Sequence, residues 1–512
     1  MTAYPKSVFG AAAAIASGHH LATQAAKDCL ENGGSLIDAM ICASAVLAVA
    51  LPHATSLGGC GMLLYLDGRS GTVHGLNGTG RAPLAADHRQ FMGGMPQRGV
   101  RAAVVPTLIR LWARAHERFG RQKWSRLLEP AISHAEDGIA TPEELARNLG
   151  RLDPEHARQP GFDSLFQPSG QPLAPGEILR QPKLAAVLKK IAACGEDGFY
   201  LGDVAASLTS FSSRHGGLFT LDDLAAAQAD WVEPWFSDIG STRAYVMPPN
   251  SVGVLMLRQL AMWHAAGRQT GTAGAVSCIE NAIAAIAHGR KLIGDPSRRA
   301  PAPADFGLGH PDTATPHPSM LAANRLDKGD TAGFVAMDKE GNAISMLQSV
   351  FQPFGSCAVD EATGVLLNNR MFDFSAEPGG MNSIGPAMRP SHTLNPWLLV
   401  RDGQADMAGA SPGGISQTTT GAQIIEGALD SPQTLGKLVS RPRWSLSRAG
   451  EILLEPGMPD AIADALRVKG YSVVENSDHE FYFGSAKLIR RTAQGWFEAA
   501  ADTRRQAVAL AW

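Results

Sequence analysis

The sequence lacks the features of membrane, zinc-binding and nucleotide-binding proteins. Its longest apolar run, residues 39–51, is shorter than the roughly 20 residues that a membrane-spanning helix needs. The six cysteines form no CxxC pair, and no histidines stand near them at metal-ligand spacing. The GxSxG elbow, the HExxH motif and the phosphate-binding P-loop are also absent. We therefore expect no metal, no cofactor and no membrane insertion.

Charge and composition are those of an ordinary globular protein. A formal net charge of −3, with 45% apolar and 18% charged residues, gives no sign of a nucleic-acid partner. Residues 9–20 lack the strongly basic start of a signal peptide, so we expect a cytoplasmic protein. The apolar run 39–51 is typical of a buried helix, because Ser35 and Asp38 have capping-box spacing and Pro52 supplies a stop.

The most informative stretch begins at Thr331. Residues 331–336 alternate as in a strand, with Ala332, Phe334 and Ala336 on one face. Residues 338–342 have the composition of a turn, and residues 343–348 predict a second strand. By itself, this pattern is compatible with a loop that ends at Asp330 and leads into an amphipathic strand. A cut before Thr331 would instead create an N-terminal threonine, whose α-amine, with a pKa near 8, acts as the base for its own hydroxyl.

Six segments, in order along the chain, resemble the γ-glutamyltransferase family. They are residues 35–61, 104–124, 127–140, 329–380, 389–403 and 409–423. The resemblance implies an N-terminal nucleophile hydrolase of the α/β (α+β) class, folded as a four-layer αββα sandwich. It also implies a precursor that cleaves itself between Asp330 and Thr331 into a large subunit, 1–330, and a small subunit, 331–512. The two fragments would associate as one intertwined domain, with a dimer of such heterodimers as a further possibility.

The segment before the expected cut is rich in proline. Residues 300–319 contain prolines that remove backbone donors from any helix or central strand. We interpret this segment as a mobile linker whose end leaves the site after cleavage.

The resemblance also assigns the catalytic groups. Thr331 is the nucleophile, and Ser349 matches a position where a hydroxyl supports it. Gly413 and Gly414 match the family's oxyanion hole. Glycine lets backbone N–H groups approach a ligand closely, and residues 415–425 predict a helix whose N-terminus faces the same place.

The expected substrate pocket departs from the family pattern. The family's carboxylate-binding arginine is replaced by Thr79, with Arg81 two positions later, and Phe351 stands at the place of a ligand-binding asparagine. Loss of this arginine removes a bidentate clamp on the glutamyl carboxylate.

Other pocket positions change as well. His392 and Thr393 replace a serine pair, and Arg370 replaces a glutamine, whereas Asp373 is retained. In our interpretation Phe351 fills part of the pocket, while Arg370 or Arg81, together with His392, supplies positive charge near the scissile amide. Alternatively, Arg370 pairs with Asp373.

These departures predict a threonine amidohydrolase that acts on a small amide bearing a carboxylate, such as oxamate. Amidohydrolases acting on oxamate occur among proteins that resemble γ-glutamyltransferases. Hydrolysis or transfer of γ-glutamyl groups, including glutathione, and a cephalosporin-type acylase remain alternatives. A further alternative is an unprocessed binding or scaffold protein without enzyme activity.

Overall fold

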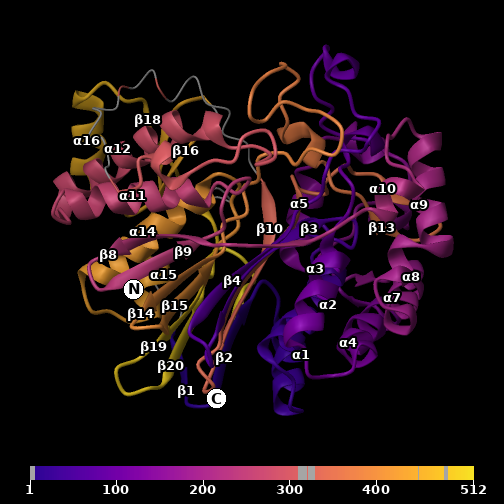
Figure 1. The fold of residues 1–512 in the computed structure, drawn as a ribbon, viewed down its shortest axis with the longest axis horizontal. Coiled ribbons are helices and arrows are strands. Elements are labelled where there is room, and N and C mark those ends of the chain that lie inside the picture. Colours follow the sequence, from indigo (N-terminus) through magenta and orange to yellow (C-terminus); the bar gives the residue numbers. More distant parts are fainter. Residues whose placement is uncertain (1–5, 310–316, 318–319, 321–328, 448, 478–482) are drawn as a thin grey trace.

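Two seven-stranded sheets pack face to face and carry helices on both outer sides (Figure 1). The computed structural model describes residues 6–309, 317, 320, 329–447, 449–477 and 483–512. The first sheet, here the β15 sheet, has the order β1 (Val8–Gly10), β20 (Phe497–Ala501), β19 (Lys487–Arg491), β15 (Gln404–Ala410), β14 (Trp397–Arg401), β9 (Thr242–Val246) and β8 (Trp235–Ile239). The second, the β10 sheet, has the order β21 (Val508–Ala511), β2 (Ala13–Ser17), β10 (Asp330–Asp338), β11 (Ala343–Phe351), β3 (Cys60–Asp67), β4 (Thr72–Gly78) and β7 (Asp230–Val232). The predicted αββα sandwich is confirmed.

Side-chain alternation along β10 explains the layering. Successive residues of a strand point to opposite faces. Phe334 and Ala336 therefore join the core beneath the helices, whereas Val335 and Met337 join the core between the two sheets. The predicted hairpin of residues 331–348 is confirmed, since β10 and β11 pair antiparallel around a turn at residues 339–342.

The helices form the two outer layers. Those on the β10 sheet include α1 (His20–Glu31), α2 (Leu36–Ala50), α3 (Leu108–Phe119), α4 (Trp124–Asp137), α7 (Pro182–Cys194), α8 (Asp197–Tyr200) and α9 (Gly202–Arg214). Those on the β15 sheet include α11 (Gly253–Ala265), α12 (Gly271–Gly289), α14 (Ser416–Asp430) and α15 (Leu435–Ser440). Among the described helices, none has the length and apolar character needed to cross a membrane.

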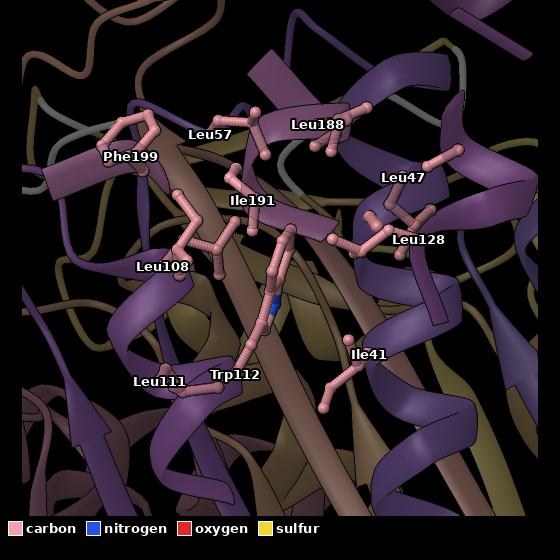
Figure 2. Packing of buried hydrophobic residues seen from close by; sticks show 14 of the residues in the cluster. Ile41, Leu47, Leu57, Leu108, Leu111, Trp112, Leu128, Leu188, Ile191 and Phe199 are labelled. Carbon is pink, nitrogen blue, oxygen red and sulfur yellow. The ribbon is translucent and has the colours of Figure 1, made fainter. Parts of the chain in front are cut away.

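Helix α2 begins and ends where the sequence predicts. The Ser35 hydroxyl accepts from the Asp38 N–H, and the Asp38 carboxylate accepts from the Ser35 N–H, which completes the capping box. Every residue of α2 is buried, because the helix packs on β10 and β11 below and on neighbouring helices around it. Trp112 of α3 lies among Ile41, Leu108 and Leu128 (Figure 2), and its indole N–H donates to Ser44 at 2.6 Å.

The described structure also includes further, smaller elements. They are α5 (Glu143–Gly150), α6 (Phe162–Phe166), α10 (Leu221–Ala225), α16 (Asp460–Val468), the pairs β5 (Ile139–Ala140) with β6 (Ile178–Leu179) and β12 (Val359–Asp360) with β13 (Val365–Leu366), the 3-10 turns η4 (Arg290–Leu292), η5 (Pro303–Phe306) and η6 (Arg370–Asp373), and the three-stranded sheet β16 (Trp444–Leu446), β17 (Ile452–Leu454) and β18 (Val473–Glu475).

The proline-rich segment differs from its prediction at its start. Residues 303–306 form the turn η5, and Phe306 is fully buried in the core of α11 and α12. Arg258 donates to the Phe306 carbonyl at 2.6 Å, so this part is anchored rather than a mobile linker. Residues 310–316 and 318–319 of the predicted linker lie outside the described residues.

Both sheets contain strands from each side of residue 330. In the β10 sheet, β10 lies between β2, from the beginning of the chain, and β11. In the β15 sheet, β14 lies between β9 and β15. The segments 1–330 and 331–512 therefore share both sheets.

Replacing Ser35 with alanine should lower the free energy of unfolding by about 1 kcal/mol, because the first turn of α2 loses its side-chain cap. Urea unfolding followed by circular dichroism measures the change. The matched control is Ser133→Ala on the exposed face of α4, which should stay within about 0.5 kcal/mol of the parent protein. Equal effects of the two substitutions would contradict the capping role.

Candidate active site

Thr331 lies near the start of β10, in the interior of the β10 sheet. The register of β10 with β11 shifts between Asp330 and Ala332, so Thr331 sits at a bulge. A bulge breaks the regular ladder and can re-aim a side chain, and bulges are common beside active sites. Thr331 is almost completely buried, at 4% exposure.

Hydrogen bonds converge on the peptide that joins Asp330 to Thr331. The Thr331 hydroxyl donates to the Asp330 carbonyl oxygen at 2.7 Å, and the Ser349 hydroxyl donates to the same oxygen at 2.6 Å. The Phe351 N–H donates to Ser349 Oγ at 2.7 Å and so fixes the serine. The Ser349 hydroxyl, as a donor to this oxygen, polarises the Asp330 carbonyl.

Gln417 is a site residue that sequence reasoning missed. Its side-chain amide donates to Thr331 Oγ1 at 3.4 Å, and its carbonyl oxygen accepts from the Asn395 N–H at 2.9 Å. It lies in the first turn of α14, directly after the predicted glycine loop. The expectation that this helix points its N-terminus at Thr331 was the signal that could have identified Gln417.

Gly413 and Gly414 form the loop between β15 and α14. Their φ angles of 134° and 60° lie in a region that favours glycine. A methyl group added at Gly329 would lie 3.2 Å from Gly414 Cα and 3.3 Å from the Phe351 carbonyl oxygen. The chain just before Thr331 therefore runs against this glycine loop and against Phe351.

The structure brings Phe351, Arg370 and Thr393 together. The Arg370 guanidinium carbon lies 3.9 Å from the centroid of the Phe351 ring, a close cation–π contact. Arg370 also donates to Thr393 Oγ1 at 3.4 Å. Phe351 has a φ of 86°, which is unusual for a bulky residue and places its ring with a strained backbone.

Asp373 has a different cationic partner from the one considered in the sequence. Arg290 of η4 donates to Asp373 Oδ1 at 3.1 Å, and Ser391 donates to Oδ2 at 2.9 Å. Sequence reasoning missed Arg290, which lies 83 positions earlier in the chain. The Asp373 carboxylate is thereby oriented by a hydroxyl and a guanidinium.

His392 is not a source of positive charge, so that part of the prediction is wrong. Burial, followed by the charges of Arg370 and Arg389, holds the pKa of His392 well below its usual range. The Leu394 N–H donates to Nδ1, so Nε2 carries the proton and faces Cys60 Sγ at 3.1 Å. The ring is therefore a neutral, buried group beside two buried arginines.

Arg81 is paired with two carboxylates, Asp230 and Asp295. Its guanidinium lies 3.5 Å from Asp230 and 3.5 Å from Asp295, and its side chain is 38% exposed. Sequence reasoning missed Arg389, whose charge acts on His392. It donates to the Thr79 carbonyl oxygen at 3.0 Å and pairs with Asp230 at 2.8 Å.

One set of side chains next to Thr331 has the spacing of metal ligands. Donor atoms of His53, Glu144 and Asp330, all buried, lie within 4.8 Å of one another. Arg505 already contacts both carboxylates, at 3.0 Å from Glu144 and in a short hydrogen bond to Asp330. A protein cation therefore balances this cluster.

The helix-covered pair of antiparallel sheets, with a threonine peptide buried at the start of a central strand, defines an N-terminal nucleophile hydrolase. The family model described as Gamma-glutamyltranspeptidase matches residues 22–512, and the chain belongs to this family. It is an enzyme that acts on amide bonds.

Relatives and solved structures agree with this assignment. The chain is 29% identical to the glutathione hydrolase-like YwrD proenzyme of Bacillus subtilis, over 99% of both chains. It is 30% identical to the oxamate amidohydrolase proenzyme of Klebsiella pneumoniae subsp. pneumoniae, over 96% of this chain and 97% of the relative. The crystal structure of cephalosporin acylase from Bacillus halodurans superposes with a TM-score of 0.90 at 26% identity, covering 100% of this chain and 98% of the other.

Replacing His392 with glutamine should make stability less dependent on pH below about 6.5. The native state keeps His392 neutral, whereas the unfolded chain binds a proton as the pH falls through about 6.5. The wild type should therefore lose up to roughly 1 kcal/mol more per pH unit than the variant between pH 6.5 and 5. Urea unfolding at several pH values measures this difference. Parallel curves would show that His392 is protonated in the folded protein.

Proposed function

We propose that this protein is a self-processing threonine amidohydrolase whose nucleophile is Thr331. The observation that carries the proposal is the geometry of the Asp330–Thr331 peptide. The nucleophilic hydroxyl is 2.7 Å from the oxygen of the carbonyl that it would attack, and Ser349 donates to that oxygen from the other strand of the hairpin. This arrangement supports cleavage of the chain by its own threonine.

Maturation proceeds by an acyl shift followed by hydrolysis. Thr331 Oγ attacks the Asp330 carbonyl carbon, the developing negative charge on the oxygen is stabilised by Ser349, and the C–N bond breaks to leave an ester. The nitrogen of Thr331 takes the hydroxyl proton and becomes a free α-amine. Water then cleaves the ester, which restores the hydroxyl and leaves Asp330 with an α-carboxylate.

The mature site uses the same hydroxyl on an external amide. The α-amine of Thr331 accepts the hydroxyl proton as Oγ attacks the substrate carbonyl and transfers that proton to the leaving amine. Backbone N–H groups at Gly413 and Gly414, beside the N-terminus of α14, stabilise the oxyanion. Water then releases the acyl group as a carboxylate.

We propose a small amide with a carboxylate near the reacting carbonyl, such as oxamate, as the substrate. Thr79 offers no guanidinium, so the clamp that γ-glutamyl substrates need is missing at that position. Arg370, stacked on Phe351 and directed to Thr393, is the cation that we assign to the substrate carboxylate. Similarity to the oxamate amidohydrolase proenzyme adds support.

An acylase that removes a larger acyl group is the second candidate. Phe351 provides a buried aromatic face beside the path of residue 329, and the cephalosporin acylase structure superposes over the whole chain. A substrate with an apolar acyl chain would use this face in place of Arg370.

The two fragments should stay together after cleavage. Residues 1–330 and 331–512 contribute neighbouring strands to both sheets, so their separation would expose the core between the sheets.

Replacing Thr331 with alanine should abolish both chain cleavage and release of ammonia from oxamate, because nucleophile and amine base are both lost. Intact-mass spectrometry under denaturing conditions follows cleavage, with the wild type giving a fragment that begins at Thr331. The control, Thr331→Ser, keeps a hydroxyl and should still be cut. An alanine variant that yields the same two fragments would refute Thr331 as the nucleophile.

Substrate classes are separated by assaying the same wild-type preparation on oxamate, a γ-glutamyl anilide and a hexanoyl anilide. Preference for oxamate, with Arg370→Met raising its KM, supports the carboxylate assignment. Preference for the hexanoyl anilide, whose acyl chain is apolar, selects the acylase instead.

Replacing Ser349 with alanine should slow cleavage of the chain by about 100-fold, because the Asp330 carbonyl loses a donor of the oxyanion-hole type. A time course of intact masses after cell-free synthesis gives the rate. Ser345→Ala is the control: this residue lies on the same strand, β11, and donates to Gly409 instead. If Ser349→Ala and the wild type are cut at the same rate, Ser349 does not stabilise the oxyanion during cleavage.

A further inference from the structure

The side chain of Asp330 lies in a largely buried cluster of ionisable groups that the proposed chemistry does not use. Asp330 and His53 are 0% exposed, and Glu144 and Arg505 are 7% exposed. These residues come from four distant parts of the chain: the end of α2, the first turn of α5, the start of β10 and the segment before β21. The cluster is therefore a product of tertiary folding.

Arg505 connects the two carboxylates of the cluster. Its Nη1 lies 3.0 Å from Glu144 Oε1 and donates a short hydrogen bond to Asp330 Oδ1. Burial opposes the charge of Arg505, but Asp330 and Glu144 raise its pKa. Burial would also raise the pKa of Glu144, yet Arg505 and then His53 hold it well below its usual range. The cation and its two anions are thus mutually stabilised in a site with little water.

The Asp330 carboxylate also binds the peptide that joins Asp330 to Thr331. The Thr331 N–H donates to Asp330 Oδ1 at 2.7 Å, so a single oxygen binds both the scissile amide and Arg505. The chain of contacts from Glu144 through Arg505 and Asp330 to the Thr331 nitrogen fixes the plane of that peptide. Ser349 and Thr331 Oγ1 fix the carbonyl end of the same peptide.

His53 lies on the other side of Asp330 from the Thr331 N–H, beside both carboxylates. His53 Nε2 lies 3.5 Å from Glu144 and 3.8 Å from Asp330 Oδ2, and its ring packs near Phe354. Glu144 is held by its place at the start of α5, where its N–H donates to Gln506 at 3.4 Å. His53 and Glu144, which lie next to Asp330, are therefore themselves held by contacts with other residues.

We propose that the Asp330 carboxylate, anchored by Arg505 and Glu144, is a positioning group for self-cleavage of the chain. It holds the scissile peptide in line with the Thr331 hydroxyl. This inference rests on the proposed function of Thr331. A misplacement of about 1 Å can reduce the rate of a positioned reaction by 10²-fold, so loss of the anchor should act on the cleavage rate.

A double-mutant cycle on the full-length chain tests the proposal. Asp330→Ala, Arg505→Gln and the double variant are made by cell-free synthesis, and the fraction of cut chain is followed by intact mass. Asp330→Ala should slow cleavage by about 100-fold and Arg505→Gln by at least about 10-fold. The double variant should be no slower than Asp330→Ala, because residues that act as one unit give non-additive effects.

Matched variants separate positioning from folding. Asp330→Asn keeps an oxygen that can accept from Thr331 N–H and should cleave faster than Asp330→Ala. Asp338→Asn makes the same change near the other end of β10 and should cleave as the wild type does. Thermal unfolding of each uncut variant, with Thr331→Ala as the uncut reference, shows whether the fold persists.

Two results would overturn the proposal: cleavage of Asp330→Ala within threefold of the wild type, or single effects that multiply in the double variant. If Arg505→Gln fails to fold, the comparison of Asp330→Ala with Asp330→Asn still decides, since equal rates would exclude an anchor. A wild-type chain that stays uncut throughout the time course would instead refute the proposed function of Thr331.

Discussion

The pairing of β10 with β11 is the constraint on which the site depends. It places Asp330 opposite Phe351 and, across the bulge, brings Ser349 within 2.6 Å of the Asp330 carbonyl oxygen. β2 on the other side of β10 and the buried helix α2 beneath it hold this strand in place. A peptide fixed in this way has lost most of its conformational freedom, so that a threonine with an ordinary hydroxyl can lie in a reactive geometry.

The charges around His392 are the second determinant of the site. Arg370 and Arg389 are both buried, and their charges, after burial itself, keep His392 neutral. Burial lowers the pKa of Arg389, but Asp230 pairs with it at 2.8 Å and opposes that shift. This part of the site therefore combines two permanent cations with a neutral imidazole.

Local patterns allowed much of the fold to be predicted. Both ends of α2 depend on contacts within a few residues, made by Ser35, Asp38 and Pro52. The alternation of side chains along the strands predicts the hairpin of β10 and β11. The closeness of Ser349 to Thr331 follows from that hairpin, because a short turn fixes the register. The glycine loop at Gly413 and Gly414 could be placed at the site only through the family resemblance, since no local pattern connects it to β10.

What sequence reasoning missed depends on long-range packing. Arg290 and Asp373, or Arg505 and Asp330, meet because separate elements fold against each other. The charge of His392 was predicted wrongly for a related reason: the side chain is ionisable near neutral pH in water, and only its burial beside two arginines keeps it neutral. The start of the proline-rich segment was predicted to be a mobile linker, but Phe306 packs into the core formed by α11 and α12.

The proposed cleavage would change the electrostatics of the Asp330 cluster. In the uncut chain, Arg505 faces the carboxylates of Glu144 and Asp330, and nearby Lys487, whose pKa burial lowers to about 8, is still mostly cationic at pH 7. The proposed cut adds an α-carboxylate to Asp330 and an α-amine to Thr331 in the same buried place. The α-amine is neutral when it acts as the base, so three carboxylates then face only Arg505 and Lys487, in a site where an unpaired charge costs several kcal/mol. This excess of negative charge would favour the departure of residue 330 from the front of the glycine loop.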